Sequence, residues 1–126
     1  MKYFLCNICG NLVELITVGG GELVCCGEPM TELVPKTDDV GNEKHLPVLE
    51  INGSTVTVKI GSVEHPMTEE HYIDWISIFY NNKCQRVKLN HTEKPVATFE
   101  IDEEYNTLEV YSYCNVHGLW KKEFKK

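Results

Sequence analysis

The sequence predicts an all-β protein with a small cysteine-rich module first and a larger antiparallel β-sandwich after it. Three observations support this prediction. Four of the six cysteines lie in the first quarter of the 126 residues. Short β-prone runs bounded by turn residues recur through the rest of the chain. No long segment carries the 3.6-residue apolar periodicity of an amphipathic helix.

The first module is defined by a Cys6-x2-Cys9 pair and an adjacent Cys25-Cys26 pair. Residues 11–18 between the pairs are β-prone, and the following Gly19–Gly21 must turn the chain back. A unit of about 35 residues cannot build a sufficient core, so it needs a metal to fold. Four thiolates are enough for a closed tetrahedral site.

The spacing leaves the metal of this site open between zinc and iron. Structural zinc is the usual occupant of a four-cysteine module. The neighbouring Cys25 and Cys26 cannot repeat the relaxed geometry of a CxxC knuckle, so we expect a distorted ligand shell. Iron can use thiolate geometry and hydrogen bonds to set its potential, and the adjacent pair therefore favours iron.

The rest of the chain predicts a sandwich of immunoglobulin-like architecture. Residues 35–42 are polar and rich in turn formers, which indicates a linker, and we place the boundary near Lys36, giving domains of residues 1–36 and 37–126. Asn52-Gly53 and Asn81-Asn82 are expected hairpin turns. Seven short strands are expected, at residues 47–51, 54–60, 72–80, 83–89, 96–101, 107–113 and 119–124.

Composition excludes several classes of function. A formal net charge of -7 argues against nucleic acid or an anionic membrane as the partner, because such binding relies on clustered Lys and Arg. The chain has no run of about 18 apolar residues for a membrane span, and residues 1–5 lack the apolar region of a secretory signal. We therefore expect a cytoplasmic protein. Thiols stay reduced there, so the cysteines are expected to bind metal.

A second candidate metal site draws its ligands from three places in the larger unit. Cys114 and His117 lie three residues apart just after an expected strand, where a turn can direct both at one ion. Four imidazoles and one thiolate do not suit structural zinc, whereas iron(II) accepts them. An axial thiolate would leave the opposite position open for a small oxygen species. The candidate ligands are His45, His65, His71, Cys114 and His117.

Taken in order, the motifs are similar to those of the desulfoferrodoxin family over essentially the whole chain. The motifs are Cys6-x2-Cys9, Cys25-Cys26, Glu43-Lys44-His45, His65-Pro66-Met67, His71-Tyr72 and Cys114-Asn115-Val116-His117-Gly118-Leu119-Trp120. The resemblance implies a desulforedoxin-like, rubredoxin-like iron centre in the first module and a square-pyramidal iron in the second. It implies one-electron reduction of superoxide to hydrogen peroxide without dismutation, in a homodimer, with rubredoxin as the suggested electron donor.

The resemblance also implies a role for each site residue. His45, His65, His71 and His117 would be equatorial ligands, and Cys114 would be axial. Glu43 would occupy the sixth position in the ferric resting state. Lys44 would attract superoxide and help to orient the peroxide, although most lysines are simply solvated. On an acidic protein, a cation beside an open iron focuses a small anion.

Two other classes of function stay open at this point. One is an electron carrier in which the four-cysteine iron exchanges electrons and the second metal is incidental. The other is a zinc-ribbon interaction module joined to a binding sandwich. Cys84 lies outside the motifs and is expected to be a partly buried thiol, and His91 is expected at the surface.

Overall fold

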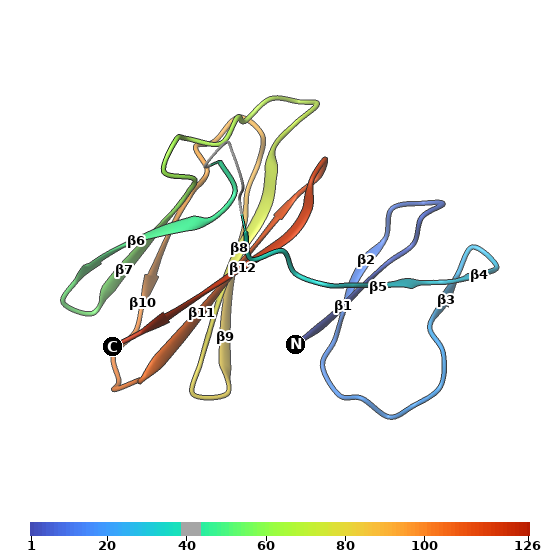
Figure 1. Ribbon diagram of the computed structural model, residues 1–126, viewed down its shortest axis with the longest axis horizontal. Coiled ribbons are helices and arrows are strands. Elements are labelled where there is room, and N and C mark those ends of the chain that lie inside the picture. Colours follow the sequence, from blue (N-terminus) through green and yellow to red (C-terminus); the bar gives the residue numbers. More distant parts are fainter. Residues whose placement is uncertain (39–43) are drawn as a thin grey trace. The chain divides into compact units, whose positions relative to one another are not determined.

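The computed structural model describes residues 1–38 and 44–126, and these residues form strands and no helix (Figure 1). The all-β prediction is confirmed. The chain divides into two compact units, Met1–Val34 and Pro35–Lys126. In the described part of the chain, no helix is long and apolar enough to cross a membrane.

The first unit contains short strands and little apolar core. Strands β1 (Lys2–Leu5), β2 (Leu12–Leu15) and β5 (Thr31–Leu33) form a sheet in the order β2-β1-β5, and β3 (Val24–Cys25) pairs with β4 (Glu28–Pro29). Among the described residues of this unit, Tyr3 and Cys6 alone are buried. So small a core agrees with the expectation that a metal stabilises this unit.

The second unit is a sandwich of two antiparallel sheets. Their orders are β10-β7-β6 and β12-β11-β8-β9. Each of the seven predicted runs is a strand whose ends lie within one residue of the expected ones. The strands are β6 (Pro47–Asn52), β7 (Thr55–Ile60), β8 (Ile73–Tyr80), β9 (Lys83–Lys88), β10 (Val96–Glu100), β11 (Thr107–Cys114) and β12 (Gly118–Lys125).

The two predicted hairpin turns are both present, one of them shifted. Asn81 and Asn82 connect β8 to β9 with φ angles of 48° and 60°, the left-handed pair that a two-residue turn of this kind needs. Between β6 and β7, Asn52 is paired with Thr55, so the two loop residues are Gly53 and Ser54. The turn therefore lies one residue later than Asn52-Gly53, with glycine at the first loop position.

The core lies between the two sheets. Val56, Val58 and Ile60 face it together, as the alternation of β7 predicts. From the other sheet Ile76, Ile78, Leu108 and Val110 are almost fully buried in the same cluster, which also includes Cys114. A thiol is thus built into the edge of the apolar core.

One end of the sandwich gathers the segments that matter for the second metal site. Pro47 is paired with Ile60, and Cys114 is paired with both Ile73 and Gly118. The start of β6, the end of β7, the start of β8 and the turn from β11 to β12 therefore meet there. Each candidate ligand of the second site lies at or just beyond one of these strand ends.

Cys84 is exposed, which corrects the expectation of a partly buried thiol. It lies on β9, the last strand of its sheet, opposite Phe79. The short sequence of β9 does not reveal that its strand is at a sheet edge.

Candidate metal centres

The four cysteines of the first unit form one cluster, here called centre I. Cys6, Cys9, Cys25 and Cys26 place their sulfur atoms within 4.8 Å of one another. The Cys9 and Cys25 sulfurs are 3.6 Å apart. Cys26 has a φ of 54°, a left-handed conformation that costs a residue with a side chain about 1–2 kcal/mol. The adjacent pair is therefore accommodated by a strained backbone at Cys26.

Hydrogen bonds make the four sulfurs of centre I unequal. The backbone N–H groups of Cys9 and Ile8 lower the pKa of Cys6 to about 6. Hydrogen bonds among the thiols, those from Cys9 first, raise the pKa of Cys25 and Cys26. Asn11 Nδ2 also donates to the Cys25 sulfur at 3.6 Å. One sulfur is thus ready as a thiolate, and a cation would take the place of the protons on the others.

The second cluster, here called centre II, contains every ligand that the sequence predicted for it. His45, His65, His71 and Cys114 each offer an atom within 4.8 Å of the others. His117 Nδ1 lies 3.1 Å from His45 Nε2 and 3.9 Å from the Cys114 sulfur. The five candidate ligands, which are spread over residues 45–117 of the sequence, therefore meet at one point.

The four imidazoles of centre II form a closed ring of edge-to-face contacts. His45 contacts His65 at 4.9 Å between ring centroids, and His65 contacts His71 at 4.7 Å. His71 contacts His117 at 5.0 Å, and His117 contacts His45 at 4.8 Å. The angles between ring planes are 68–79°. Four nitrogen donors arranged in this way can surround one ion.

Buried nitrogens without partners support a metal at this point. Nε2 of His65 and Nε2 of His71 are buried and have no hydrogen-bond partner. His65 Nδ1 lies 2.7 Å from the Pro66 carbonyl, which places its proton on Nδ1 and leaves the Nε2 lone pair for a ligand bond. Burial lowers the pKa of His65 to about 4 and also lowers that of His71. Both rings are therefore held in the neutral, metal-binding form.

Cys114 completes the ligand set. It is fully buried, and burial raises the pKa of its thiol. The backbone N–H of His117 donates to its sulfur at 3.4 Å, which favours the thiolate. A buried thiolate needs a positive charge nearby, and a metal ion held by the four imidazoles supplies it.

Residues outside the ligand set hold centre II in shape. The ring of Trp120 stacks on His45, with 4.4 Å between centroids and 10° between planes. The side chain of Asn115 bonds to Tyr72 N–H and to the Glu70 carbonyl, on both sides of His71. Asn115 belongs to the motif of residues 114–120 but is not itself a predicted ligand. Its place between Cys114 and His117 was the signal that could have revealed its role.

The two predicted catalytic residues precede His45. Lys44 is exposed, and its charge is among the effects that lower the pKa of His71, after burial and the neighbouring imidazoles. The positive charge of its ammonium group therefore acts on a ligand of centre II. Glu43 lies outside the described residues.

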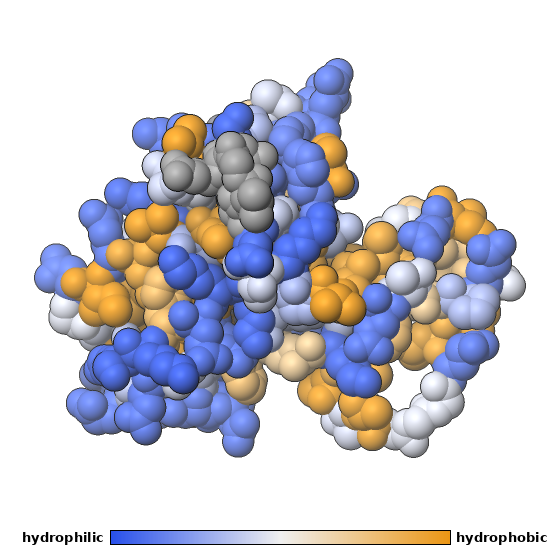
Figure 2. Space-filling model, viewed as in Figure 1, coloured by the Kyte–Doolittle hydropathy of each residue, from blue (hydrophilic) through white to orange (hydrophobic). Residues whose placement is uncertain are grey.

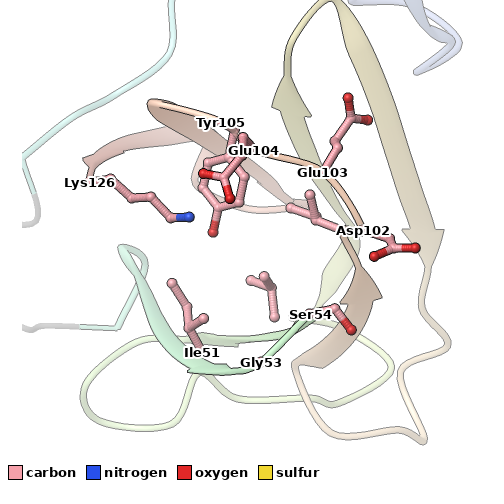
Figure 3. Close-up of a pocket in the computed structure, with 10 residues that line it drawn as sticks. Ile51, Gly53, Ser54, Asp102, Glu103, Glu104, Tyr105 and Lys126 are labelled. Carbon is pink, nitrogen blue, oxygen red and sulfur yellow. The ribbon is translucent and has the colours of Figure 1, made fainter.

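A separate cavity of about 380 Å³ lies at the other end of the sandwich (Figure 3). It opens beside the β6–β7 turn, at the end of these strands remote from His45. Its wall includes Asp102, Glu103 and Glu104, and Glu103 is paired with Lys83 at 2.5 Å. None of the ligands of centres I and II lines it.

Comparison with known proteins identifies the family. Residues 37–123 match the family profile Desulfoferrodoxin, and residues 1–33 match the profile Desulfoferrodoxin, N-terminal domain. The chain belongs to the desulfoferrodoxin family. It carries two iron centres, one with four cysteines and one with four histidines and a cysteine. The zinc alternative for centre I is thereby set aside.

Named relatives cover nearly the whole chain. A desulfoferrodoxin of Syntrophotalea carbinolica is 46% identical over 98% of this chain and 96% of its own length. A desulfoferrodoxin homolog of Methanothermobacter thermautotrophicus is 47% identical over 94% of this chain and 95% of its own. The crystal structure of the superoxide reductase from Treponema pallidum is similar with a TM-score of 0.79 and 34% identity, covering 96% of both chains.

Proposed function

We propose that the chain is a superoxide reductase that reduces superoxide to hydrogen peroxide at centre II and so removes a reactive oxygen species. One superoxide, one electron and two protons give one hydrogen peroxide. The observation that carries the proposal is the closed ring of four imidazoles beside the buried sulfur of Cys114. The solved structure from Treponema pallidum bears the name of this activity.

The ligands have separate tasks in this reaction. Iron held by these residues would supply one-electron redox chemistry, with the electron coming from an external donor. The four neutral imidazoles hold the ion without adding negative charge, so an anionic substrate is not repelled by them. Within the set of four histidines and one cysteine, Cys114 is the anionic ligand, and its thiolate favours release of an electron from the site.

Lys44 is proposed as the residue that draws superoxide to the site and orients the peroxide. The chain has a net charge of -7, so a small anion needs a local positive field. The exposed position of Lys44 next to His45 suits this role. Glu43 is proposed as a carboxylate that would bind the iron in the ferric resting state.

The remaining assignments concern domains, donor and location. We propose a four-cysteine iron domain that ends near Lys36 and a catalytic domain that follows it to residue 126. A rubredoxin is the proposed electron donor, tested by the rate at which it reduces the oxidised protein. A cytoplasmic location suits six cysteines of which at least five serve as thiolate ligands, and cell fractionation tests it.

A homodimer is proposed because the first unit exposes apolar side chains (Figure 2). Ile16 is 87% exposed, Val18 is 61% exposed and Ile8 is 57% exposed. Burying these side chains against a second copy of the chain would remove apolar surface from water. Sedimentation of the iron-loaded protein tests the assignment, and Ile16→Ser is expected to weaken the dimer.

The experiment for the proposed function is a visible spectrum of the reduced, iron-loaded protein before and after one equivalent of superoxide. A charge-transfer band from the Cys114 sulfur to iron(III) of centre II, separate from the bands of the four-cysteine centre I, is expected in the parent protein and not in Cys114→Ser. If only centre I changes colour, the protein is an electron carrier and the proposal fails.

A further inference from the structure

Lys36 lies outside every ligand motif, yet its backbone is fixed against β12. Its N–H donates to the Leu119 carbonyl at 2.9 Å, and its carbonyl accepts from Lys121 N–H at 2.9 Å. These bonds form a parallel bridge with Trp120. The position of the Lys36 backbone relative to the start of β12 is therefore set by the sheet.

The side chain of Lys36 contacts one ligand residue of centre II and the aromatic ring that stacks on another. Its ammonium group donates to the backbone carbonyl of His117 at 2.6 Å. It also lies 5.3 Å from the centroid of the Trp120 ring, within the range of a cation–π contact. That ring stacks on His45. Lys36 thus contacts one ligand residue directly and a second one through Trp120.

The positive charge of Lys36 lies beside the ligands of centre II. Its ammonium group is bonded to the backbone of His117 and lies against the Trp120 ring. The ferrous site carries one positive charge fewer than the ferric site. A nearby cation therefore stabilises the ferrous form relative to the ferric form.

We propose that Lys36 is a positioning residue of centre II that holds the His117 carbonyl and favours the ferrous iron. This inference rests on the proposed function of centre II. The roles of the two lysines differ, because Lys44 is proposed to act on superoxide whereas Lys36 acts on the ligands.

The test is a redox titration of the full iron-loaded protein, followed by the charge-transfer band from Cys114 to iron(III). Lys36→Gln keeps a hydrogen-bond donor but removes the charge. Lys36→Met removes both and keeps an apolar stem against Trp120. Lys125→Gln is the matched control, because it removes the same charge at the far end of β12. The rate at which a chelator removes iron from centre II is measured for each protein.

At the parent's midpoint potential, the ratio of ferrous to ferric centre II is expected to fall about fivefold in Lys36→Gln and Lys36→Met. Iron release is expected to be faster in Lys36→Met than in Lys36→Gln, because only the former loses the bond to His117. Potentials and release rates equal to those of Lys125→Gln in both variants overturn the role of Lys36. A parent protein without the band overturns the proposed function as well, so the two failures are distinguishable.

Discussion

Asn115 ties Tyr72 to the turn that carries two ligands of centre II. Tyr72 N–H donates to Asn115 Oδ1 at 2.8 Å, and Asn115 N–H donates to the Tyr72 carbonyl at 3.2 Å. Asn115 Nδ2 donates to the Glu70 carbonyl at 2.9 Å. One side chain between Cys114 and His117 thus fixes both neighbours of His71.

Replacing Asn115 is therefore expected to loosen His71. Asn115→Ala removes both side-chain bonds, and we expect the affinity of centre II for iron to fall about tenfold, as for other residues that orient metal ligands. Asn115→Asp keeps the acceptor for Tyr72 but loses the donor to Glu70, so its loss should be smaller. Competition with a chelator measures the iron affinity of centre II in both variants. Asn52→Ala, at the opposite end of β6 from His45, is the control. An Asn115→Ala protein with parental iron affinity would contradict this role.

Gly61 makes room for the segment that carries Lys44. Its φ is +88°, and a Cβ built on it would lie 2.7 Å from the Lys44 carbonyl oxygen and would overlap the Val63 carbonyl oxygen. Gly61→Ala is expected to lower the free energy of unfolding by about 2–3 kcal/mol and to slow the reaction with superoxide, since Lys44 must move.

Gly53→Ala is the matched control for Gly61→Ala. Gly53 also has a positive φ, +64°, but a Cβ there meets nothing within 4 Å. We expect a loss of about 1 kcal/mol and an unchanged superoxide rate. Thermal unfolding and stopped-flow kinetics measure the two quantities, and equal effects of both substitutions would argue against the clash at Lys44.

Lys44→Ala is expected to keep both irons and to slow association with superoxide by about tenfold at low ionic strength. The loss should shrink as salt is added, because salt screens the attraction. Lys44→Arg should retain most of the rate. Lys59→Ala, which removes an exposed lysine paired with Glu50 at 3.2 Å, is the control. Pulse-radiolysis rates that match between Lys44→Ala and the parent would exclude this role.

Acid should release iron from centre II only at low pH. The pKa of His65 is lowered by burial to about 4, against about 6.5 for an ordinary imidazole. A lowered pKa keeps the neutral ligand form as pH falls, so we expect the centre II spectrum to persist at pH 5 and to be lost near pH 4. Loss with a midpoint near 6.5 would show that His65 is not protected by burial.

Local signals explain why the strands could be predicted. The alternation in β7 and the Asn81–Asn82 turn each involve neighbouring residues, and both are present in the structure. A continuous apolar run such as that of β8 does not show which of its side chains face the core between the two sheets. Trp75 and Tyr113 are paired across β8 and β11 and stack on each other, outside the cluster that contains Ile76. The sequence does not show which face of the sheet carries this aromatic pair.

The metal ligands could be predicted because cysteine and histidine are the usual metal-binding side chains. The residues that hold these ligands in position could not be predicted. Lys36 was placed in a linker, yet it bonds to Leu119 and to His117, more than eighty residues away. Asn115 likewise acts on Tyr72, 43 residues before it. Contacts this distant along the chain depend on how strands pair, which no local pattern records.

The most direct test of the account is the product yield when superoxide meets the fully reduced protein. Reduction gives one hydrogen peroxide for each superoxide consumed and no oxygen, and this is the result we predict. Dismutation gives one hydrogen peroxide and one oxygen for every two superoxides. Oxygen released in an amount equal to the peroxide would contradict the assignment of centre II as a reductase site.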